Sequence, residues 1–422
     1  MPEHRKRIIH NFISLSFVQG LSILFPLITF PYLLRVLGVE GFGLFTLIQT
    51  VLMYADLLVS FGFGLTATQH IARNLSNEER TQNVISAVFI IKGILFTISM
   101  IGFFLMAIFI PFLRENVWYI LLASLYVMGN IFFPDWYFQG VQKMRSMTVV
   151  ALLSKSISLV LIMILVHSKN DILFAIFALA AGNFIAGLIG FYLLSRTISL
   201  KLKNPGKRFL YSIFRESAVV FTSIMLVPLY SSVNLFILRA FTNPLMVGYY
   251  AIAEKIYSAL AMLTNIANRT FYPHLSQLYA KSKDAYRKNV RSIVAIFLAG
   301  FTILSLIIYF TAPWIVKLVS GLHQDNEIDY AVQLLSIMCI GLFFSPYVSF
   351  FFQLLVIQGQ RKSAFKNIAV VVVVNLVCGT LLTFLFSGKG MAVNLCINTF
   401  LLALINYISF RRKHPELEHS PS

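Results

Sequence analysis

Long apolar runs alternate with short polar stretches along the whole chain. The first run covers residues 11–34, and a second follows the turn LGVEGFG at 37–43. About twenty helical residues span the ~30 Å hydrocarbon core of a bilayer, so each run is long enough to cross a membrane. The pattern predicts twelve membrane-spanning helices, at 11–34, 42–69, 81–110, 117–139, 147–167, 172–195, 214–238, 246–275, 290–312, 329–357, 365–386 and 390–410.

Composition agrees with this all-α, polytopic membrane class. Hydrophobic residues make up 58% of the chain and charged residues only 12%, and the mean hydropathy is +0.80. A soluble domain does not need such a composition, whereas repeated membrane spans require it. The formal charge of +18 is scattered through short loops. It forms no basic domain that could bind a nucleic acid.

The basic residues instead indicate the orientation in the membrane. Of the 34 Lys and Arg residues, 24 fall on one side of the predicted helices, six on the other and four within helices. Because cytoplasmic loops carry the excess of Lys and Arg, this split predicts that both termini are cytoplasmic.

Two short matches indicate that the chain repeats itself at half length. Gln139–Gly140 and Lys143 align with Gln358–Gly359 and Lys362. Arg35 and Arg239 also occupy similar places, eight residues before Gly43 and nine before Gly248 respectively. Two six-helix halves that begin on the same side form a parallel repeat, which is typical of transporters.

This repeat predicts a division into two lobes. The expected parts are an N-terminal lobe at 1–195, a cytoplasmic linker at 196–215, a C-terminal lobe at 216–410 and a cytoplasmic tail at 411–422. The linker alternates apolar and basic residues, so it is either an interfacial amphipathic helix or a basic connection.

Ionisable residues within or near the ends of the apolar runs are the candidate functional residues. Each costs roughly 2.5–3.5 kcal/mol at a helix centre, so it is seldom retained without a partner or a polar cavity. The candidate cavity cations are Lys92, Lys155, Lys255, Arg269, Arg35 and Arg239. The candidate coupling carboxylates are Asp56, Glu254 and Asp135.

Several of these residues have two interpretations. Asp56 is either a coupling carboxylate or half of a structural ion pair with a buried lysine. Lys92 lies too deep for easy snorkelling, which favours a cavity, whereas Lys155 fits either interpretation. Glu254 and Lys255 point about 100° apart on a helix and cannot both face one wall.

The three arginines lie near helix ends, where anchoring at the interface is the default interpretation. Close helix packing explains the small-residue spacing of Gly182, Ala186 and Gly190. The sequence shows no spacing of histidine or cysteine that indicates a metal site, and no nucleophile and base arrangement that indicates an enzyme.

Four stretches in order carry a family resemblance. Besides the turn at 37–43, they are DWYFQGVQKM at 135–144, VGYYAIAEKI at 247–256 and FYPHLSQL at 271–278. Together they resemble the Wzx-type polysaccharide repeat-unit flippases. That family belongs to the multidrug/oligosaccharidyl-lipid/polysaccharide exporter (MOP) superfamily, which includes the MATE exporters.

The resemblance implies a function in the bacterial inner membrane. Such proteins move undecaprenyl-diphosphate-linked oligosaccharide from the cytoplasmic to the outer leaflet by alternating access, for O-antigen or another surface polysaccharide. It implies membrane lipids, a polysaccharide polymerase and a chain-length regulator as partners, and no cofactor beyond a coupling H⁺ or Na⁺. The cations would suit the diphosphate, and Asp56 or Glu254 could couple an ion.

Two alternatives remain open at this point. A MATE-like drug or metabolite exporter would share the fold, although cationic substrates favour carboxylates over an excess of cations. A membrane polysaccharide polymerase would handle the same lipid, but it should carry a large outer loop with catalytic residues. The longest outer loop expected here is 313–328.

Overall fold

The structure is a computed structural model that describes residues 2–198, 203–321 and 325–412. Throughout these ranges every regular element is an α-helix. The chain divides into two compact units, Met1–Met225 and Leu226–Ser422. The finer limits expected from the sequence, with a separate linker at 196–215, remain a prediction.

Each unit is a bundle of long helices. The N-terminal unit contains α1 (Pro2–Ser60), α2 (Phe63–Arg73), α3 (Glu78–Phe109), α4 (Pro111–Glu115), α5 (Val117–Phe132), α6 (Asp135–Gly140), α7 (Met144–Leu165) and α8 (Ile172–Thr197). Helix α9 (Lys207–Ser231) begins in this unit and ends in the next. The C-terminal unit continues with α10 (Val233–Phe241), α11 (Pro244–Lys281), α12 (Lys283–Ser320), α13 (Asp325–Ile357) and α14 (Arg361–Arg412).

Two of the longest helices contain sharp kinks where the sequence predicts turns. In α1 the kink is at Gly38, whose φ of 71° and ψ of 175° lie outside the helical region. A glycine adopts such a positive φ without the steric cost that a Cβ would bring. In α14 the kink is at Ser387, between the two predicted helices 365–386 and 390–410.

The apolar helices confirm the predicted fold class. Within the described ranges, nine helical stretches are long and apolar enough to cross a membrane. The chain is therefore an all-α, polytopic membrane protein. The exact number of crossings and the side on which the termini lie remain predictions.

Some predicted loops and helix limits were wrong. The outer loop expected at 313–328 is much shorter, because α12 continues to Ser320 and α13 begins at Asp325. The cytoplasmic loop expected at 276–289 shrinks to Ser282, whose side chain accepts a hydrogen bond from the backbone N–H of Ala285 and caps α12. Around Ser282 polar residues continue both helices beyond the apolar span, which hydropathy does not reveal, whereas α12 continues through Pro313 into the mostly apolar residues 314–319.

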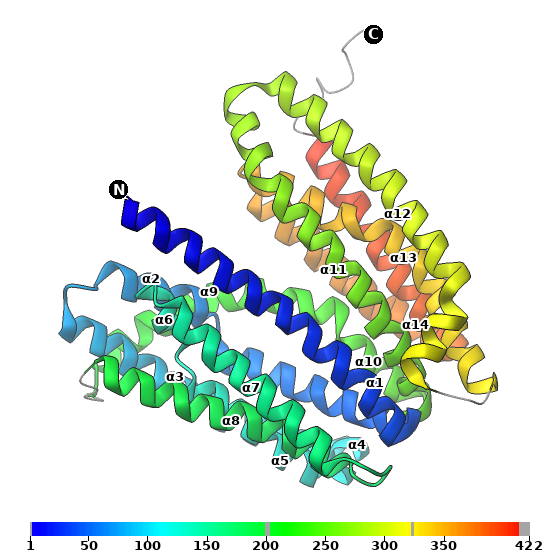
Figure 1. The fold of residues 1–422 in the computed structure, drawn as a ribbon, viewed down its shortest axis with the longest axis horizontal. Coiled ribbons are helices and arrows are strands. Elements are labelled where there is room, and N and C mark those ends of the chain that lie inside the picture. Colours follow the sequence, from blue (N-terminus) through cyan, green and yellow to red (C-terminus); the bar gives the residue numbers. More distant parts are fainter. Residues whose placement is uncertain (1, 199–202, 322–324, 413–422) are drawn as a thin grey trace. The chain divides into compact units, whose positions relative to one another are not determined.

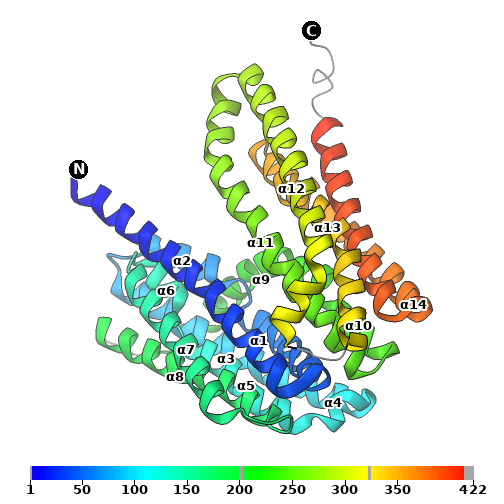
Figure 2. The ribbon, with the colours of Figure 1, turned by 45° about the vertical axis from the view of Figure 1, so that its right-hand side comes forward.

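In the N-terminal unit, α8 lies side by side with α5 and α7 in Figures 1 and 2. Glycines permit this contact: a Cβ on Gly129 would lie 2.6 Å from the backbone oxygen of Asn183. The stripe of Gly182, Ala186 and Gly190 is buried, as predicted for a packing face. Close backbone approach of this kind is usual where membrane helices carry small residues.

In the C-terminal unit, α11, α12, α13 and α14 pack against one another and can be followed in both ribbon views (Figures 1 and 2). Aromatic and aliphatic side chains fill the space between them, including Phe297, Phe350, Leu354 and Phe410. This core carries no charged side chain among its buried members.

Candidate functional site

Two opposite charges lie in the apolar interior of the N-terminal unit. Asp56 comes from α1, and Lys92 comes from α3. The Lys92 side chain is only 3% exposed. Since a charge at this depth is costly, its surroundings must supply partners.

A chain of hydrogen bonds ends at the Asp56 carboxylate. Ser154 Oγ donates to Asn183 Oδ1 over 3.3 Å, and Asn183 Nδ2 donates to Asn130 Oδ1 over 2.9 Å. Asn130 Nδ2 then donates to Asp56 Oδ1 over 2.6 Å. The members come from α7, α8, α5 and α1. Each donor is directed toward Asp56, which is the arrangement that an acceptor-only carboxylate requires.

Lys92 joins the same network from α3. Its Nζ donates to the backbone oxygen of Asn130 over 2.9 Å. Among the described residues no direct ion pair joins Lys92 and Asp56. Asn130 therefore stands between the two charges. We call Asp56, Lys92, Asn130, Asn183 and Ser154 the charged network.

The structure brings a third predicted residue close to this network. Asp135, the first residue of α6, interacts electrostatically with both Asp56 and Lys92. Lys155 lies on α7 next to Ser154 and is half-buried. In the N-terminal unit, therefore, one carboxylate and one ammonium are each hydrogen-bonded to Asn130, and Asp135 interacts electrostatically with both.

The other predicted site residues do not join the charged network. Arg35 is exposed on α1. Arg239, at the end of α10, donates to the backbone oxygen of Thr242 over 3.0 Å, which is a local contact. Both placements agree with their default interpretation as residues near helix ends.

The remaining three candidates lie on α11. Glu254 accepts a hydrogen bond from Ser258 one turn further along, over 2.6 Å. Lys255 is half-buried. Arg269 lies in the same helix, but its side chain is outside the described residues.

Sequence reasoning missed the amides that organise both units. In the N-terminal unit these are Asn130 and Asn183. In the C-terminal unit Asn394 Nδ2 donates to Asn375 Oδ1 over 2.7 Å, and Asn367 Nδ2 donates to Asn406 Oδ1 over 2.9 Å. Asparagines inside apolar runs are a usable signal, but a search for charges alone passes over them.

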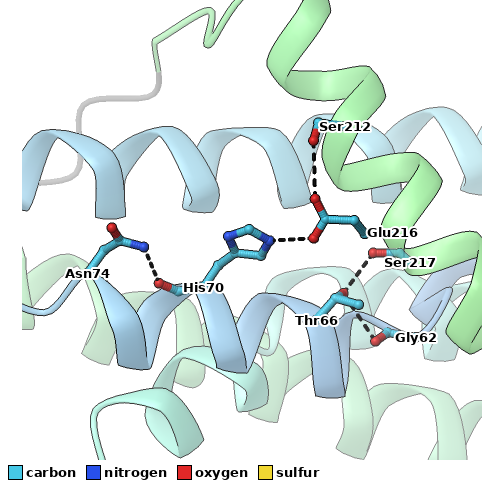
Figure 3. A network of polar contacts seen from close by, with 7 residues as sticks. All are labelled: Gly62, Thr66, His70, Asn74, Ser212, Glu216 and Ser217. Carbon is cyan, nitrogen blue, oxygen red and sulfur yellow. Dashed lines mark hydrogen bonds and ion pairs between the residues drawn. The ribbon is translucent and has the colours of Figure 1, made fainter.

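A second polar cluster of the N-terminal unit ties α2 to α9. Figure 3 shows His70 Nε2 facing Glu216 Oε2 at 2.8 Å, and Ser212 beside the same carboxylate. One turn away, Thr66 Oγ1 lies 2.7 Å from Ser217 Oγ. Half of the Glu216 side chain is exposed, so the ion pair contributes at most about 1 kcal/mol.

A metal site has no support in the described parts of the chain. They contain no group of three or more histidine, cysteine, aspartate or glutamate side chains that could hold a metal ion.

Solved structures with the same fold define the class of protein. A MATE family multidrug resistance transporter of the MOP superfamily, in an inward-facing conformation, matches with a TM-score of 0.72 at 14% identity, over 94% of this chain and 99% of that one. The lipid II flippase MurJ matches with a TM-score of 0.65 at 12% identity, over 95% and 87%. The chain is thus a multi-pass membrane protein with the fold of the MOP superfamily.

Sequence relatives narrow this class to a family. Residues 8–279 match the family described as polysaccharide biosynthesis protein, and the chain belongs to that family. It is 30% identical over 410 residues to an Escherichia coli (strain K12) protein named "Putative O-antigen transporter", covering 93% of this chain and 95% of that one. A Shigella dysenteriae protein of the same name is 27% identical over 401 residues, covering 93% and 98%.

These findings confirm the resemblance read from the sequence. The protein is a transporter of the bacterial inner membrane and not an enzyme, since it belongs to this family and its curated relatives are named transporters.

Proposed function

We propose that this protein flips undecaprenyl-diphosphate-linked oligosaccharide repeat units from the cytoplasmic to the outer leaflet, by ion-coupled alternating access, for O-antigen or another surface polysaccharide. Membership of the polysaccharide biosynthesis family, with relatives named as O-antigen transporters, is the observation that carries this proposal. A diphosphate and a sugar cannot cross hydrocarbon without polar partners, so the protein must supply them.

The charged network supports a division of roles between its two ions. Lys92 carries three N–H donors, of which one is bound to Asn130, so the others are suited to a diphosphate oxygen. Asp56 is the proposed coupling carboxylate, because it lies inside the helices and has a partner on α5. Lys92 and Asp56 are both hydrogen-bonded to Asn130. An anion bound at Lys92 and a proton or Na⁺ bound at Asp56 can therefore influence each other.

The roles of the other predicted site residues are also proposals, with fewer contacts to support them. Lys155, Lys255, Arg269, Arg35 and Arg239 remain proposed contacts for the diphosphate or for membrane lipids, and Glu254 and Asp135 remain proposed coupling groups. A polysaccharide polymerase and a chain-length regulator remain the proposed protein partners.

Lipid-linked intermediates measured by leaflet test the proposal directly. A strain lacking this chain should accumulate undecaprenyl-linked repeat units on the cytoplasmic face, and the restored chain should relieve that accumulation. If the intermediates were exposed outside but unpolymerised, flipping would not be the missing step. If they were unchanged, a MATE-like exporter would become the better hypothesis.

The coupling ion is tested separately in vesicles that contain the protein. Transport driven by a pH gradient, and not by a Na⁺ gradient, indicates proton coupling, and the reverse result indicates Na⁺. Asp56→Asn should remove the response to the gradient. A variant that kept the full response would exclude Asp56 as the coupling residue.

A further inference from the structure

The break between α5 and α6 leaves one backbone oxygen without its helical donor. In an α-helix the carbonyl of residue 130 accepts from the N–H of residue 134. Residue 134 is proline, which has no N–H. The preceding carbonyl, of Gly129, is still bound by the N–H of Phe133 over 3.0 Å. The break therefore exposes the oxygen of Asn130.

Lys92 donates a hydrogen bond to this free oxygen. Its ammonium approaches from α3 to 2.9 Å, so the carbonyl that the proline leaves free and the buried ammonium bind each other. The acceptor belongs to the main chain and cannot rotate away or change its protonation state. Its position is fixed further by α8, because Asn183 Nδ2 also donates to the backbone oxygen of Tyr126 over 2.8 Å.

The side chain of the same residue holds the opposite charge. Asn130 Nδ2 donates to Asp56, and Asn130 Oδ1 accepts from Asn183. One residue thus fixes both charges while keeping them from pairing directly. A direct ion pair would neutralise each partner, whereas this spacing leaves each charge with capacity for a ligand or a coupling ion.

We propose that Asn130 and Pro134 are positioning residues for transport: the proline frees the carbonyl that holds Lys92, and the asparagine amide holds Asp56. This inference rests on the proposed function for its readout in transport. The contacts themselves can be tested independently of transport.

Exchanging the two side chains tests the amide contact. In Asn130→Asp two carboxylates meet, and in Asp56→Asn two amides meet. The double variant Asp56→Asn/Asn130→Asp restores one amide and one carboxylate, and the carboxylate now at position 130 can still accept from Asn183. We expect about a tenfold loss of flipping in each single variant, as for a hydrogen bond to a charged group. The double variant should return to within about threefold of the parent.

A matched asparagine on the same stretch of chain provides the control. Asn116, at the start of α5, bonds only its own neighbourhood through Phe112, so Asn116→Asp should flip normally. If the double variant were as inactive as the singles, or if Asn130→Ala kept full transport, the role of the amide would be overturned. A merely structural role would lower the melting temperature of the single variants and leave transport per folded molecule unchanged.

The proline is tested by a double-mutant cycle. Pro134→Ala supplies an N–H that competes with Lys92 for the oxygen of Asn130, and we expect a loss of flipping of about three- to tenfold. In a Lys92→Met background the same change should have no further effect, because the competitor is gone. Additive losses would overturn the proposal. Pro313→Ala, at an exposed proline of α12, is the matched control.

Thermal unfolding of all these variants separates the two possible failures. If the parent chain did not relieve the accumulation of intermediates, the proposed function would fail. Even in that case, the double variant Asp56→Asn/Asn130→Asp should recover the melting temperature lost in the single variants. The changes in melting temperature caused by Pro134→Ala and Lys92→Met should likewise remain non-additive. If flipping were normal and these couplings were absent, the positioning proposal alone would fail.

Discussion

The two units of this protein build polar interiors of different kinds. The N-terminal unit holds a buried ammonium and a half-buried carboxylate, both hydrogen-bonded to Asn130. The C-terminal unit buries neutral amides that bond one another, at Asn375 with Asn394 and at Asn367 with Asn406. A neutral hydrogen bond between membrane helices stabilises by only about 0.6 kcal/mol on average, whereas a charge costs several kcal/mol to place there. The costly arrangement is found in the N-terminal unit.

The helix prolines of the two units differ in the same way, in whether a charged or a neutral group binds the carbonyl that each leaves free. The carbonyl freed by Pro134 is taken by a lysine from another helix. The carbonyl that Pro346 frees in α13, at Leu342, accepts from the hydroxyl of Ser345 on the same helix, over 3.0 Å. The carbonyl oxygen that a proline leaves free can thus accept a hydrogen bond from its own helix or from a charged side chain of another helix. The N-terminal unit thus holds the charged network on which the proposed function relies, whereas the C-terminal amides bond one another.

Glycine contacts should matter equally in both units and have the largest effect. A Cβ on Gly187 would meet the backbone oxygen of Gly129, and one on Gly390 would meet that of Leu382. Either Gly→Ala change forces backbones apart, so we expect a cost of about 1–3 kcal/mol or more and little folded protein. Size-exclusion profiles and melting temperatures in detergent would measure this.

The control for this prediction is Gly102→Ala in α3. A Cβ there meets nothing within 4 Å, so folding should be unaffected or slightly improved. Normal folding of the Gly187→Ala variant would contradict the packing seen between α5 and α8.

Removing the buried ammonium should have the next largest effect, on transport rather than on folding. Lys92→Met keeps the length of the side chain but leaves the oxygen of Asn130 without its partner. A lost hydrogen bond to a charged group is worth about 1.5–3 kcal/mol, so transport per folded molecule should fall about 10- to 100-fold. Leaflet-resolved analysis of lipid-linked intermediates, normalised to the amount of protein, checks this.

A neutral amide of the C-terminal unit should behave in the opposite way. Asn394→Leu removes the bond to Asn375, and we expect a loss of about 1 kcal/mol in stability with normal transport per folded molecule. Melting temperature and the same flipping assay would be compared with those of Lys92→Met. Equal losses of transport in the two variants would remove the contrast between the units.

The smallest effect is expected at a charge outside the network. Asp171 accepts hydrogen bonds from the backbone N–H groups of His167 and Ser168, and these contacts lower the pKa of its carboxyl. A lowered pKa in the folded state stabilises above the ordinary value of 3.8, and the contribution disappears as the pH falls through the folded pKa.

Asp171→Asn should therefore lower the melting temperature slightly at pH 7 and converge with the parent in strong acid. Transport at neutral pH should be unchanged. A large loss of transport would show that charge in the N-terminal unit matters in general, and not the particular network at Asp56 and Lys92.

Sequence reasoning predicted much of the fold because the membrane imposes it. Runs of apolar residues had to be helices, since a bilayer offers no partner for an open backbone. The turn at 37–43 was located correctly, with Gly38 as the kink. The loop at 313–328 was too long because α12 continues through Pro313 to Ser320.

The sequence also identified the two charges of the network, Asp56 and Lys92, because an Asp or Lys deep in an apolar run is rare enough to be noticed. It did not identify their partners: Asn130 is 74 residues from Asp56 and 38 from Lys92. The composition of the chain determined a polytopic, positively charged membrane protein. Only the tertiary structure decided which of nine candidate ions meet, because that depends on how helices distant in sequence pack and on the carbonyl that Pro134 leaves free.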